Sequence, residues 1–484
     1  MKSFDLIVIG SGPAGEKAAV KAAYFNYTVA LIEKEPDFGG AGVQTGTLPS
    51  KTLRETALYL SGIYQKGVFG VDKEIGREVG IKDFMYRKTI VSKEMGDIVK
   101  QNLLDHQVEI FSGTASFEDD HHIKVKGAFE EVIFGRNILV ATGSYPYHPD
   151  AIPFDELRVH DSDSILNIEK FPKSICVLGA GVIGCEYATI FGAMGVKTCM
   201  VNNVNRILEF LDNEVSEALV NQMRENGINI LFNNSIKDYY VPDDHDKPLS
   251  LQLDSGETLN VDMFLYAAGR SGNIKMLQCE NAGINIGERE TLLVNENYQT
   301  NIPHIYAVGD VIGFPALASI GMEQGRVAVN HMLDAGDLEK ITEIFPYGIY
   351  TVPEVSMVGV TEEEAKEKGI NYALGYSCHC DMARGMIVGG QDDGFLKLIF
   401  ERESKTIIGV HIIGPMATEL IHYGMGLVQD QKTLLQVIST VFNYPTLHDL
   451  YKYASYDGLG NLKGRKMKKS KSKTQFRNLD DPEK

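Results

Sequence analysis

The pattern of apolar and polar positions at the start of the chain predicts a strand, a helix and a second strand. The apolar run FDLIVI ends at Ile9, and a glycine-rich turn and a helical stretch follow it. A second apolar run, TVALIE, ends at Glu33. Short apolar runs joined through a helical stretch are typical of parallel βαβ units.

The turn after the first run carries three glycines in G-x-G-x-x-G spacing. Gly10 would permit the tight turn, Gly12 would let the backbone approach a pyrophosphate, and Gly15 would let helix and strand pack closely. The helix N-terminus attracts phosphate, and Glu33 can accept hydrogen bonds from ribose hydroxyls. Together these features predict a dinucleotide site rather than a merely structural turn.

The same pattern occurs a second time. The segment SICVLGAGVIGCEYATIFGAMGVKTCMVNN predicts a strand, a turn with Gly179, Gly181 and Gly184, a helix and another strand. The offset that leads from Gly10 to Glu33 leads here to Asn202, so the second site lacks the ribose-binding carboxylate.

Three further segments predict strands that run into glycine turns. They are ILVATGSYP with Thr142 and Gly143, LYAAGRSGN with Gly269 and Arg270, and HIYAVGDVIG with Asp310. An aspartate at the carboxyl end of a strand can accept a bond from a sugar or ribityl hydroxyl, although each segment alone could be only a turn. Two dinucleotide sites in one chain suggest a flavin and a nicotinamide that exchange a hydride.

The length of the chain predicts the number of domains, and its net charge limits the kinds of partner. The 484 residues predict two or three domains, and the net charge of −18 disfavours nucleic acid and anionic membrane as partners. The charge is uneven, because residues 463–484 hold nine Lys or Arg and three Asp or Glu. We expect this basic tail to be disordered, either as a solvated terminus or as a contact for nucleic acid or an acidic partner.

The six cysteines show no spacing typical of a disulfide framework, which favours reduced thiols in a cytoplasmic protein. The alternation in YSCHCDM predicts that Cys378 and Cys380 share one face of a strand. No signal peptide, membrane-spanning run or metal-ligand spacing is evident, so we expect neither a membrane anchor nor a metal.

The motifs resemble those of the FAD-dependent pyridine nucleotide-disulfide oxidoreductases. GTLPSK resembles the family's segment at the flavin, GVIGCEYA its second glycine motif and YAVGD its late flavin motif. The resemblance implies an α/β fold with two Rossmann-like domains, for FAD and NAD(P), and a C-terminal α+β dimerisation domain. The implied divisions are 1–150 and 276–345 for FAD, 151–275 for NAD(P), 346–462 for dimerisation and 463–484 for the tail.

The family's disulfide chemistry is missing from this sequence. Gly42 and Thr47 stand where the family has two cysteines, and Tyr444 and Asp449 stand where it has a histidine–glutamate dyad. Tyrosine, with an ordinary pKa near ~10, is a poor thiol base at neutral pH. The resemblance further implies that Gly39, Gly40 and Gly42 contact FAD, and that Lys51 and Glu186 act at the flavin and the nicotinamide.

These observations predict hydride transfer between NADPH and NAD⁺ through FAD, without a redox-active disulfide and with the family's Si-face specificity. NAD(H) and NADP(H) would be substrates, FAD would be bound once per subunit, and the protein would be a homodimer or a higher homo-oligomer. Two alternatives remain open. One is an NAD(P)H oxidase or diaphorase, and the other is a non-catalytic binding subunit.

Overall fold

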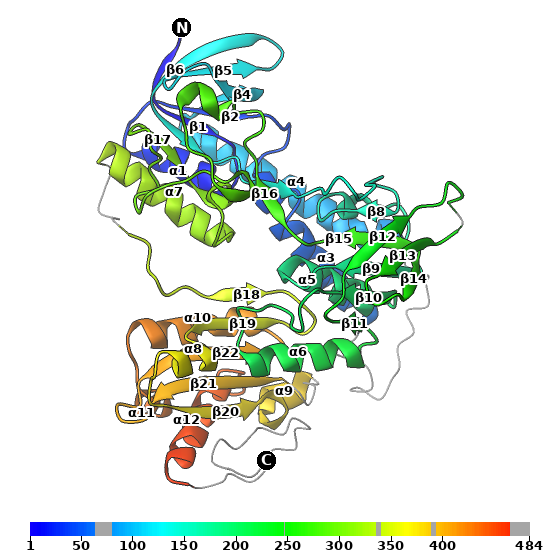
Figure 1. Cartoon of the computed structure of the whole chain (residues 1–484). Coiled ribbons are helices and arrows are strands. Elements are labelled where there is room, and N and C mark those ends of the chain that lie inside the picture. Colours follow the sequence, from blue (N-terminus) through cyan, green and yellow to red (C-terminus); the bar gives the residue numbers. More distant parts are fainter. Residues whose placement is uncertain (63–79, 246, 335–339, 389–393, 465–484) are drawn as a thin grey trace. The chain divides into compact units, whose positions relative to one another are not determined.

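The structure, a computed structural model, describes residues 1–62, 80–245, 247–334, 340–388 and 394–464. The chain divides into two compact units (Figure 1). The first unit comprises Met1–Leu53, Gly80–Lys170 and Ala268–Thr342, and the second unit takes the remaining described residues.

The first unit is built on a seven-stranded sheet in the order β3-β2-β1-β6-β5-β4, with β17 also pairing with β6. Strands β3, β2, β1, β6 and β17 run parallel, whereas β5 and β4 are antiparallel additions. The bounds are β1 (Ser3–Ile9), β2 (Val29–Glu33), β3 (Glu109–Ser112), β4 (Thr114–Phe117), β5 (His122–Lys126), β6 (Glu130–Val140) and β17 (Ile305–Ala307).

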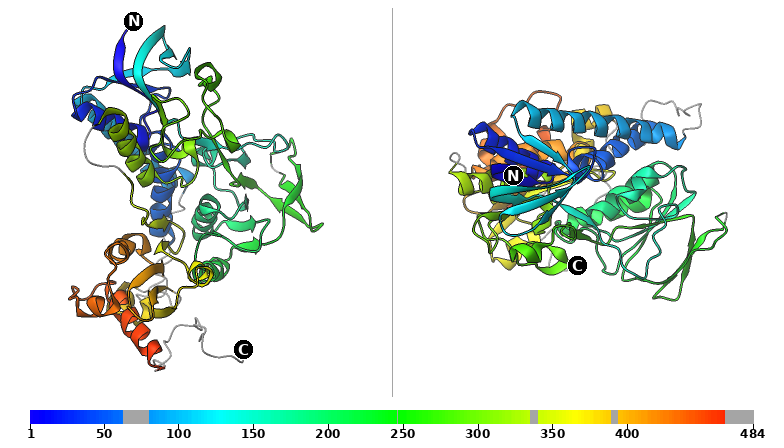
Figure 2. Two further views of the ribbon diagram at one scale, coloured as in Figure 1. Left: turned by 60° about the vertical axis from the view of Figure 1, so that its left-hand side comes forward. Right: turned by 90° about the horizontal axis from the view of Figure 1, so that it is seen from above.

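Three helices cover one face of this sheet, α1 (Pro13–Tyr24), α4 (Ile81–Asp105) and α7 (Ala318–Leu333) (Figures 1 and 2). Leu6, Val8 and Leu31 from the strands are fully buried against Ala18 and Ala22 of α1. The alternate strand residues Ile7, Ile9 and Ile32 belong to a second core on the opposite face. Burial on both faces explains why the strands read as continuous apolar runs.

Several short elements complete the first unit. Strands β7 (Ser144–Pro146) and β16 (Arg270–Gly272) pair antiparallel with each other. Strand β8 (Val159–His160) and helix α2 (Gly40–Val43) are short, and helix α3 (Thr47–Ser61) continues from the first unit into the second.

The second unit contains another parallel arrangement, β11-β10-β9-β15. It comprises β9 (Ser174–Leu178), α5 (Val182–Ala193), β10 (Lys197–Val201), α6 (Asn213–Glu225), β11 (Asn229–Leu231) and β15 (Met263–Tyr266). Beside it lies an antiparallel sheet of β12 (Ile236–Tyr240), β13 (Leu249–Leu253) and β14 (Thr258–Val261).

The carboxyl-terminal part of the second unit is an antiparallel sheet, β18-β19-β22-β21-β20, packed with helices. The strands are β18 (Tyr347–Ile349), β19 (Val355–Gly359), β20 (Tyr372–Cys378), β21 (Phe395–Glu401) and β22 (Ile407–Ile413). The helices are α8 (Glu362–Glu367), α9 (Ala383–Val388), α10 (Ala417–Gln429), α11 (Leu434–Ser439) and α12 (Asp449–Leu462).

A buried ion cluster links α6 to this sheet within the second unit. The ammonium of Lys397 on β21 is fully buried and lies 3.0 Å from Asp212, the N-cap of α6. It also lies 2.7 Å from Glu214 and 2.7 Å from Glu362. Because three carboxylates converge on one buried cation, the cluster fixes the start of α6 against β21 and α8.

The structure confirms the predicted α/β fold with two glycine-turn sheets followed by an α+β region. One local expectation was wrong: β20 ends at Cys378, and Cys380 falls in the following 3₁₀ turn. The predicted domain limits stay a prediction, and nearly all of the basic tail, 465–484, lies outside the described residues. None of the helices that the structure describes has the length and apolar character needed to cross a bilayer.

Candidate functional site

The first glycine-rich turn joins β1 to α1 and has the geometry that dinucleotide binding requires. Gly10 adopts φ +106°, and its N–H donates to the Ile32 carbonyl at 2.9 Å. A Cβ on Gly15 would lie 2.0 Å from the Gly10 carbonyl oxygen, so only glycine fits there. A Cβ on Gly12, the N-cap of α1, would meet nothing within 4 Å, which leaves the helix N-terminus open to a phosphate.

Glu33 is buried at the end of β2, beside this turn. One carboxylate oxygen accepts the Ser11 N–H at 2.9 Å, and the other accepts the Glu35 N–H at 2.9 Å. The Ser11 hydroxyl in turn accepts the Gly39 N–H at 3.0 Å. The backbone therefore fixes the orientation of the carboxylate that we expect to contact a ribose.

The structure brings the glycines of FGGAG against the same turn. A Cβ on Gly40 would lie 2.9 Å from the Gly12 Cα. A Cβ on Gly42 would lie 2.7 Å from the Pro13 Cγ. A cysteine at position 42 would therefore crowd the first residue of α1 unless the backbone shifted.

The segment after β6 also reaches this turn, and it carries a polar atom without a protein partner. The Ala141 carbonyl oxygen would lie 2.5 Å from a Cβ on Gly10. The Thr142 hydroxyl is buried and has no hydrogen-bond partner, and a Cβ on Gly143 would meet nothing within 4 Å. A buried polar atom needs a partner, so a hydroxyl next to open space fits a polar ligand at this place.

Asp310 follows β17 and is held by a network that reaches Arg270. The Ser144 hydroxyl donates to the Asp310 carboxylate at 3.0 Å and accepts the Arg270 Nε–H at 2.9 Å. The Arg270 guanidinium also donates to the Ser144 carbonyl at 2.8 Å and lies 3.2 Å from Asp163. Burial raises the pKa of Asp163, and the charge of Arg270 opposes this shift. The three strand-to-turn segments that contain Ser144, Arg270 and Asp310 thus meet at one place in the first unit.

The second glycine-rich turn repeats the geometry of the first in the second unit. Gly179 adopts φ +105°, and its N–H donates to the Val201 carbonyl at 2.9 Å. A Cβ on Gly184 would lie 1.9 Å from the Gly179 carbonyl oxygen, and a Cβ on Gly181 would meet nothing within 4 Å. The N-terminus of α5 is therefore as open to a phosphate as that of α1.

Asn202 follows β10 at the place where the first unit has Glu33, and its amide braces a loop. Its Nδ2 donates to the Arg206 carbonyl at 2.9 Å and lies 3.4 Å from the Val204 carbonyl. The Arg206 guanidinium donates to the Leu211 carbonyl. The N–H groups of this amide therefore hold the loop that carries Arg206.

Lys51 and Glu186 lie in different compact units. Lys51 is half-buried on α3, with its ammonium 3.4 Å from the Ser50 hydroxyl. Glu186 is buried on α5, and its carboxylate accepts the Tyr350 N–H at 3.0 Å. Their predicted joint action at the flavin and the nicotinamide stays a prediction.

The structure gathers the predicted residues into two groups. The group in the first unit comprises Gly10, Gly12, Gly15, Glu33, Gly39, Gly40, Gly42, Thr142 and Gly143, with the network of Arg270 and Asp310. The group in the second unit comprises Gly179, Gly181, Gly184, Glu186 and Asn202. Gly269, with φ +149°, accepts the Tyr147 N–H at 3.1 Å and shapes the turn before Arg270. Sequence reasoning missed Ser11 and Ser144, although both lie inside the quoted motifs.

Comparison with known proteins identifies the family. Residues 4–325 match the pyridine nucleotide-disulphide oxidoreductases, and residues 345–455 match the dimerisation domain of the same family. The chain belongs to the pyridine nucleotide-disulphide oxidoreductase family.

Curated relatives cover almost the whole chain. A protein of Mycobacterium bovis named soluble pyridine nucleotide transhydrogenase is 39% identical, over 96% of this chain and 98% of its own length. Proteins of the same name from Hahella chejuensis and Vibrio cholerae are also 39% identical, over 95% of this chain.

Solved structures share the fold. The HOCl-induced flavoprotein disulfide reductase RclA of Escherichia coli has a TM-score of 0.82 and 25% identity, and the match covers 92% of this chain and 99% of that one. LpdA of Mycobacterium tuberculosis has a TM-score of 0.85 and 24% identity, over 94% and 99%. These matches show that this chain shares the fold of both proteins.

Proposed function

We propose that this protein is an FAD-dependent enzyme that transfers a hydride between NADPH and NAD⁺ without a redox-active disulfide. One observation carries the proposal: both glycine-rich turns keep dinucleotide geometry, while the two positions for the family's cysteines hold Gly42 and Thr47. The names of the curated relatives support the same activity.

The packing around residue 42 supports the absence of a thiol relay. The close approach to Pro13 leaves little room for a side chain at position 42. Thr47 begins α3, and its hydroxyl cannot cycle between thiol and disulfide. Electrons would therefore have to pass between nucleotides without a protein dithiol.

The residues of the first unit suit FAD. The open N-terminus of α1 would face the pyrophosphate, Glu33 a ribose, and Asp310 the sugar-like chain of the flavin. When bound, the flavin would supply the hydride acceptor and donor chemistry. The ammonium of Lys51 would stabilise negative charge on the reduced ring, and Glu186 would orient the nicotinamide end of the site.

The second unit would bind NADP(H) and NAD(H) in turn at one place. A carboxylate after β10 would repel the 2′-phosphate of NADPH, and a cluster of arginines would favour it strongly. Asn202 and Asn203 are neutral, and Arg206, in the loop that the Asn202 amide holds, is a single positive charge. This segment therefore neither repels the 2′-phosphate nor strongly favours it. That balance suits a site that must release one nucleotide and accept the other.

We further propose a homodimer formed through the family's dimerisation domain. Val441 and Tyr444 are 92% and 73% exposed in the single chain, and such apolar exposure is typical of an interface.

All six cysteines are free thiols, which supports the predicted reducing, cytoplasmic setting. Transfer at the Si face of the flavin is part of the proposal.

The decisive experiment is anaerobic spectroscopy of the purified holoenzyme. NADPH should bleach the flavin absorption, and NAD⁺ should restore it with stoichiometric formation of NADH. Bleaching that only oxygen or a quinone reverses would favour the oxidase or diaphorase alternative. A protein that binds no flavin, or whose flavin no nucleotide reduces, would favour the non-catalytic alternative.

A second assay addresses the missing disulfide. The enzyme should not reduce lipoamide or oxidised glutathione, because no thiol pair stands at positions 42 and 47. Turnover of either disulfide at a rate comparable with nicotinamide exchange would contradict the proposal.

A further inference from the structure

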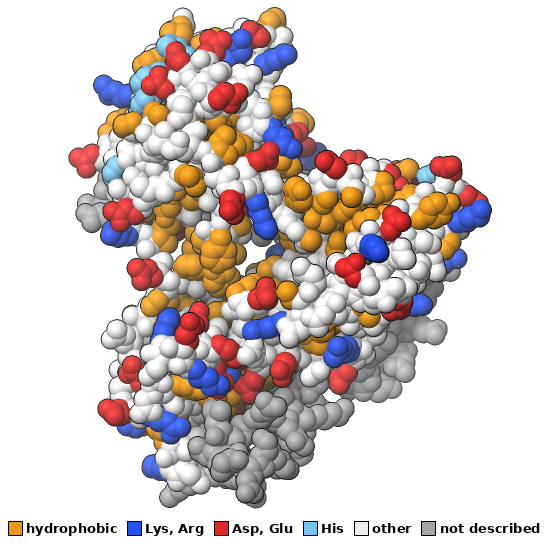
Figure 3. Space-filling view, in the orientation of Figure 1, with side chains coloured by type: hydrophobic (Ala, Val, Ile, Leu, Met, Phe, Trp, Pro, Cys, Tyr) orange, Lys and Arg blue, Asp and Glu red, His pale blue; other side chains and the backbone are white. Residues whose placement is uncertain are grey.

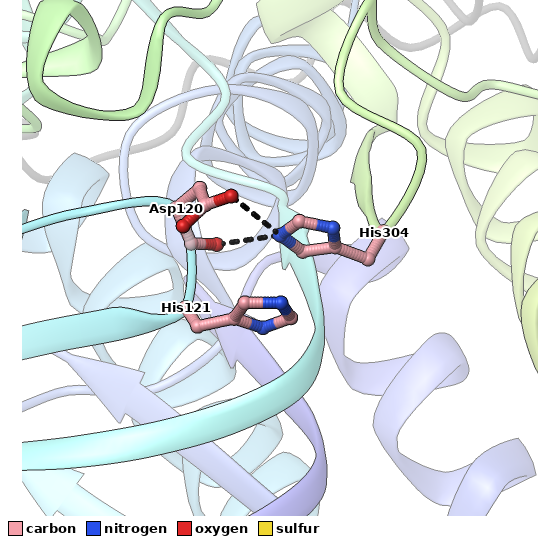
Figure 4. Close-up of side chains that lie close together, drawn as sticks. All are labelled: Asp120, His121 and His304. Carbon is pink, nitrogen blue, oxygen red and sulfur yellow. Dashed lines mark hydrogen bonds and ion pairs between the residues drawn. The ribbon is translucent and has the colours of Figure 1, made fainter.

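One side-chain cluster in the first unit has no part in the proposed hydride transfer. The turn between β4 and β5 carries Asp120 and His121, and His304 stands just before β17 (Figure 4). The imidazole rings of His121 and His304 are stacked, with centroids 3.8 Å apart and planes 7° from parallel. One potential ligand atom from each of the three residues lies within 4.8 Å of the other two.

The backbone already orients both imidazoles. The His121 Nδ1 lies 2.7 Å from the Gly135 carbonyl, so it is the donor, and Nε2 keeps its lone pair. A histidine that donates one ring N–H to a carbonyl and presents the other nitrogen is the usual arrangement of a metal ligand. The His304 Nε2 lies 2.8 Å from the Asp120 carbonyl oxygen, so it is the donor there, and it lies 3.7 Å from the Asp120 carboxylate, as Figure 4 shows. Metal binding through this nitrogen therefore requires His304 to carry its proton on Nδ1 instead and to give up that hydrogen bond.

We propose that Asp120, His121 and His304 bind a divalent first-row transition metal ion. The Nε2 atoms of both histidines and the carboxylate of Asp120 would be the ligands, and the Asp120 carbonyl oxygen lies close enough to be a fourth. Donors bound about 2.1 Å from one ion lie about 3–4 Å apart. The 3.7 Å between the His304 Nε2 and the Asp120 carboxylate is already in that range, whereas a pair of donor atoms near the 4.8 Å limit must close by about 1 Å. The two rings must also tilt out of their parallel stack, because both lone pairs have to point at the same ion.

The donor set selects the kind of ion. Two imidazoles with one carboxylate suit Zn²⁺, Co²⁺, Ni²⁺ or Cu²⁺, whereas Mg²⁺ and Ca²⁺ prefer sites made only of oxygen. Asp120 is exposed and both histidines are partly exposed, so an ion can enter from solvent. The site could not be predicted from ligand spacing along the chain, since His304 is 184 positions from Asp120.

The ion would join two distant parts of the chain in the first unit. His121 belongs to the turn next to the antiparallel strands, and His304 leads into the last parallel strand, β17. Both segments border β6, which pairs with β5 and with β17. Metal binding there would hold the β4–β5 turn to the segment that leads into β17, and it would thereby stabilise the folded seven-stranded sheet. This role is separate from catalysis.

The neighbouring residue His122 provides a matched control. Its Nδ1 is paired with the Asp119 carboxylate at 2.8 Å, and it is not part of the three-residue cluster. Replacing His122 by glutamine therefore changes the same turn without removing a proposed ligand.

The test is zinc affinity of the full-length holoenzyme, measured by competition with a fluorescent zinc chelator. The unmodified protein should bind one Zn²⁺ tightly enough to raise its melting temperature, and a chelator should reverse the shift. His304→Gln and His121→Gln should each weaken Zn²⁺ binding by at least tenfold, and His122→Gln should not. Co²⁺ should show the visible absorption of a nitrogen-ligated ion.

Several results would overturn the proposal. They are the absence of saturable Zn²⁺ binding, an affinity that His304→Gln leaves unchanged, or an equal loss in the His122→Gln control. Should a histidine variant lose flavin or fold poorly, Asp120→Asn at the exposed position gives the same comparison. Hydride transfer without added metal should be the same in all variants, so failure here leaves the proposed function intact.

Discussion

At the scale of single residues, Lys51 carries the most specific chemical prediction. Lys51→Met keeps most of the side-chain volume and removes the charge. Loss of one electrostatic stabiliser costs about 10²-fold in rate, so flavin reduction by NADPH should slow by roughly that factor while FAD stays bound. Stopped-flow absorbance measures the rate, and Lys82→Met, at an exposed lysine of α4, is the control. Equal rates in both variants would remove Lys51 from the proposed site.

Ser144 is predicted to position Asp310 for the flavin. Its hydroxyl bridges the Asp310 carboxylate and the Arg270 guanidinium. Ser144→Ala should weaken FAD binding by about tenfold, the value of one hydrogen bond to a charged group. Reconstitution of the apoprotein, followed by flavin fluorescence, measures the affinity. Ser144→Thr retains the hydroxyl and should restore binding, whereas a threonine variant as weak as the alanine variant would exclude the bridging role.

Asn202 is predicted to decide how the enzyme treats the 2′-phosphate. Asn202→Glu places a carboxylate after β10 and should weaken NADPH more than NADH by about 1–3 kcal/mol, through repulsion. The structure adds a control, because the amide also braces the loop at Arg206. Asn202→Ala loosens that loop without adding charge and should weaken both nucleotides alike. Titration of flavin bleaching measures each affinity, and equal losses in the glutamate variant would contradict the prediction.

At the scale of elements, the buried ion cluster predicts how α6 is attached. Lys397→Met removes the buried ammonium that Asp212 and Glu362 share, which should cost about 3–5 kcal/mol of unfolding free energy. Lys366 pairs with the same Glu362 but is 55% exposed, so Lys366→Met should cost no more than about 1 kcal/mol. Denaturant unfolding compares the two variants. Similar losses of unfolding free energy would show that burial of the ammonium does not determine how much its ion pairs stabilise the protein.

The same cluster predicts a dependence on pH. Burial opposes ionisation of Asp212, but His411 and Lys397 outweigh it and hold its pKa below the ordinary value of 3.8. Burial is likewise outweighed by Lys397 at Glu362, whose pKa lies below 4.5. A lowered pKa in the folded state stabilises the protein above the unfolded value, and that contribution is lost as the pH falls through the folded value. The acid transition below about pH 4 should therefore be weaker in Lys397→Met.

The elements around both glycine turns were predictable because local chemistry determines them. Gly10, Gly15 and Gly184 stand where any side chain would meet backbone, and Gly179 has a positive φ that favours glycine, so the glycine spacing predicts the strand, turn and helix. Cys380 was misplaced because alternation continues for two residues beyond the last ladder pair of β20, Cys378 with Phe395. The bridge through Ser144 could not be predicted, since it depends on tertiary packing of three separate segments.

At the scale of the whole molecule, we expect the dimer to depend on the exposed Val441 and not on the basic tail. Deleting residues 463–484, which follow the last residue of α12, should leave the dimer and its flavin intact. Val441→Asp should weaken the dimer, because it puts a charge on a side chain that is 92% exposed in the single chain and that we expect a partner to cover. Light scattering measures both masses. A fully active monomer would contradict the proposed assembly.

Charge on the molecular surface agrees with small nucleotides as partners. On the face shown in Figure 3, acidic and basic side chains are interspersed instead of being gathered by sign. The excess of acid belongs to the whole sequence, with 65 Asp and Glu against 47 Lys and Arg. Attraction for the anionic nucleotides would therefore be local, from the helix N-termini at the two glycine turns.

The seven-stranded sheet has a consequence for how the protein is made. Its β1 begins at Ser3, but β17, which pairs with β6, ends at Ala307, and Asp310 follows it. A ribosome that has released only the first 170 residues therefore carries a sheet that lacks its last parallel strand. Domains usually begin to fold as they emerge, yet this one must wait while the whole segment 171–267 is translated. Capture of the flavin would thus be a late event in the synthesis of each chain.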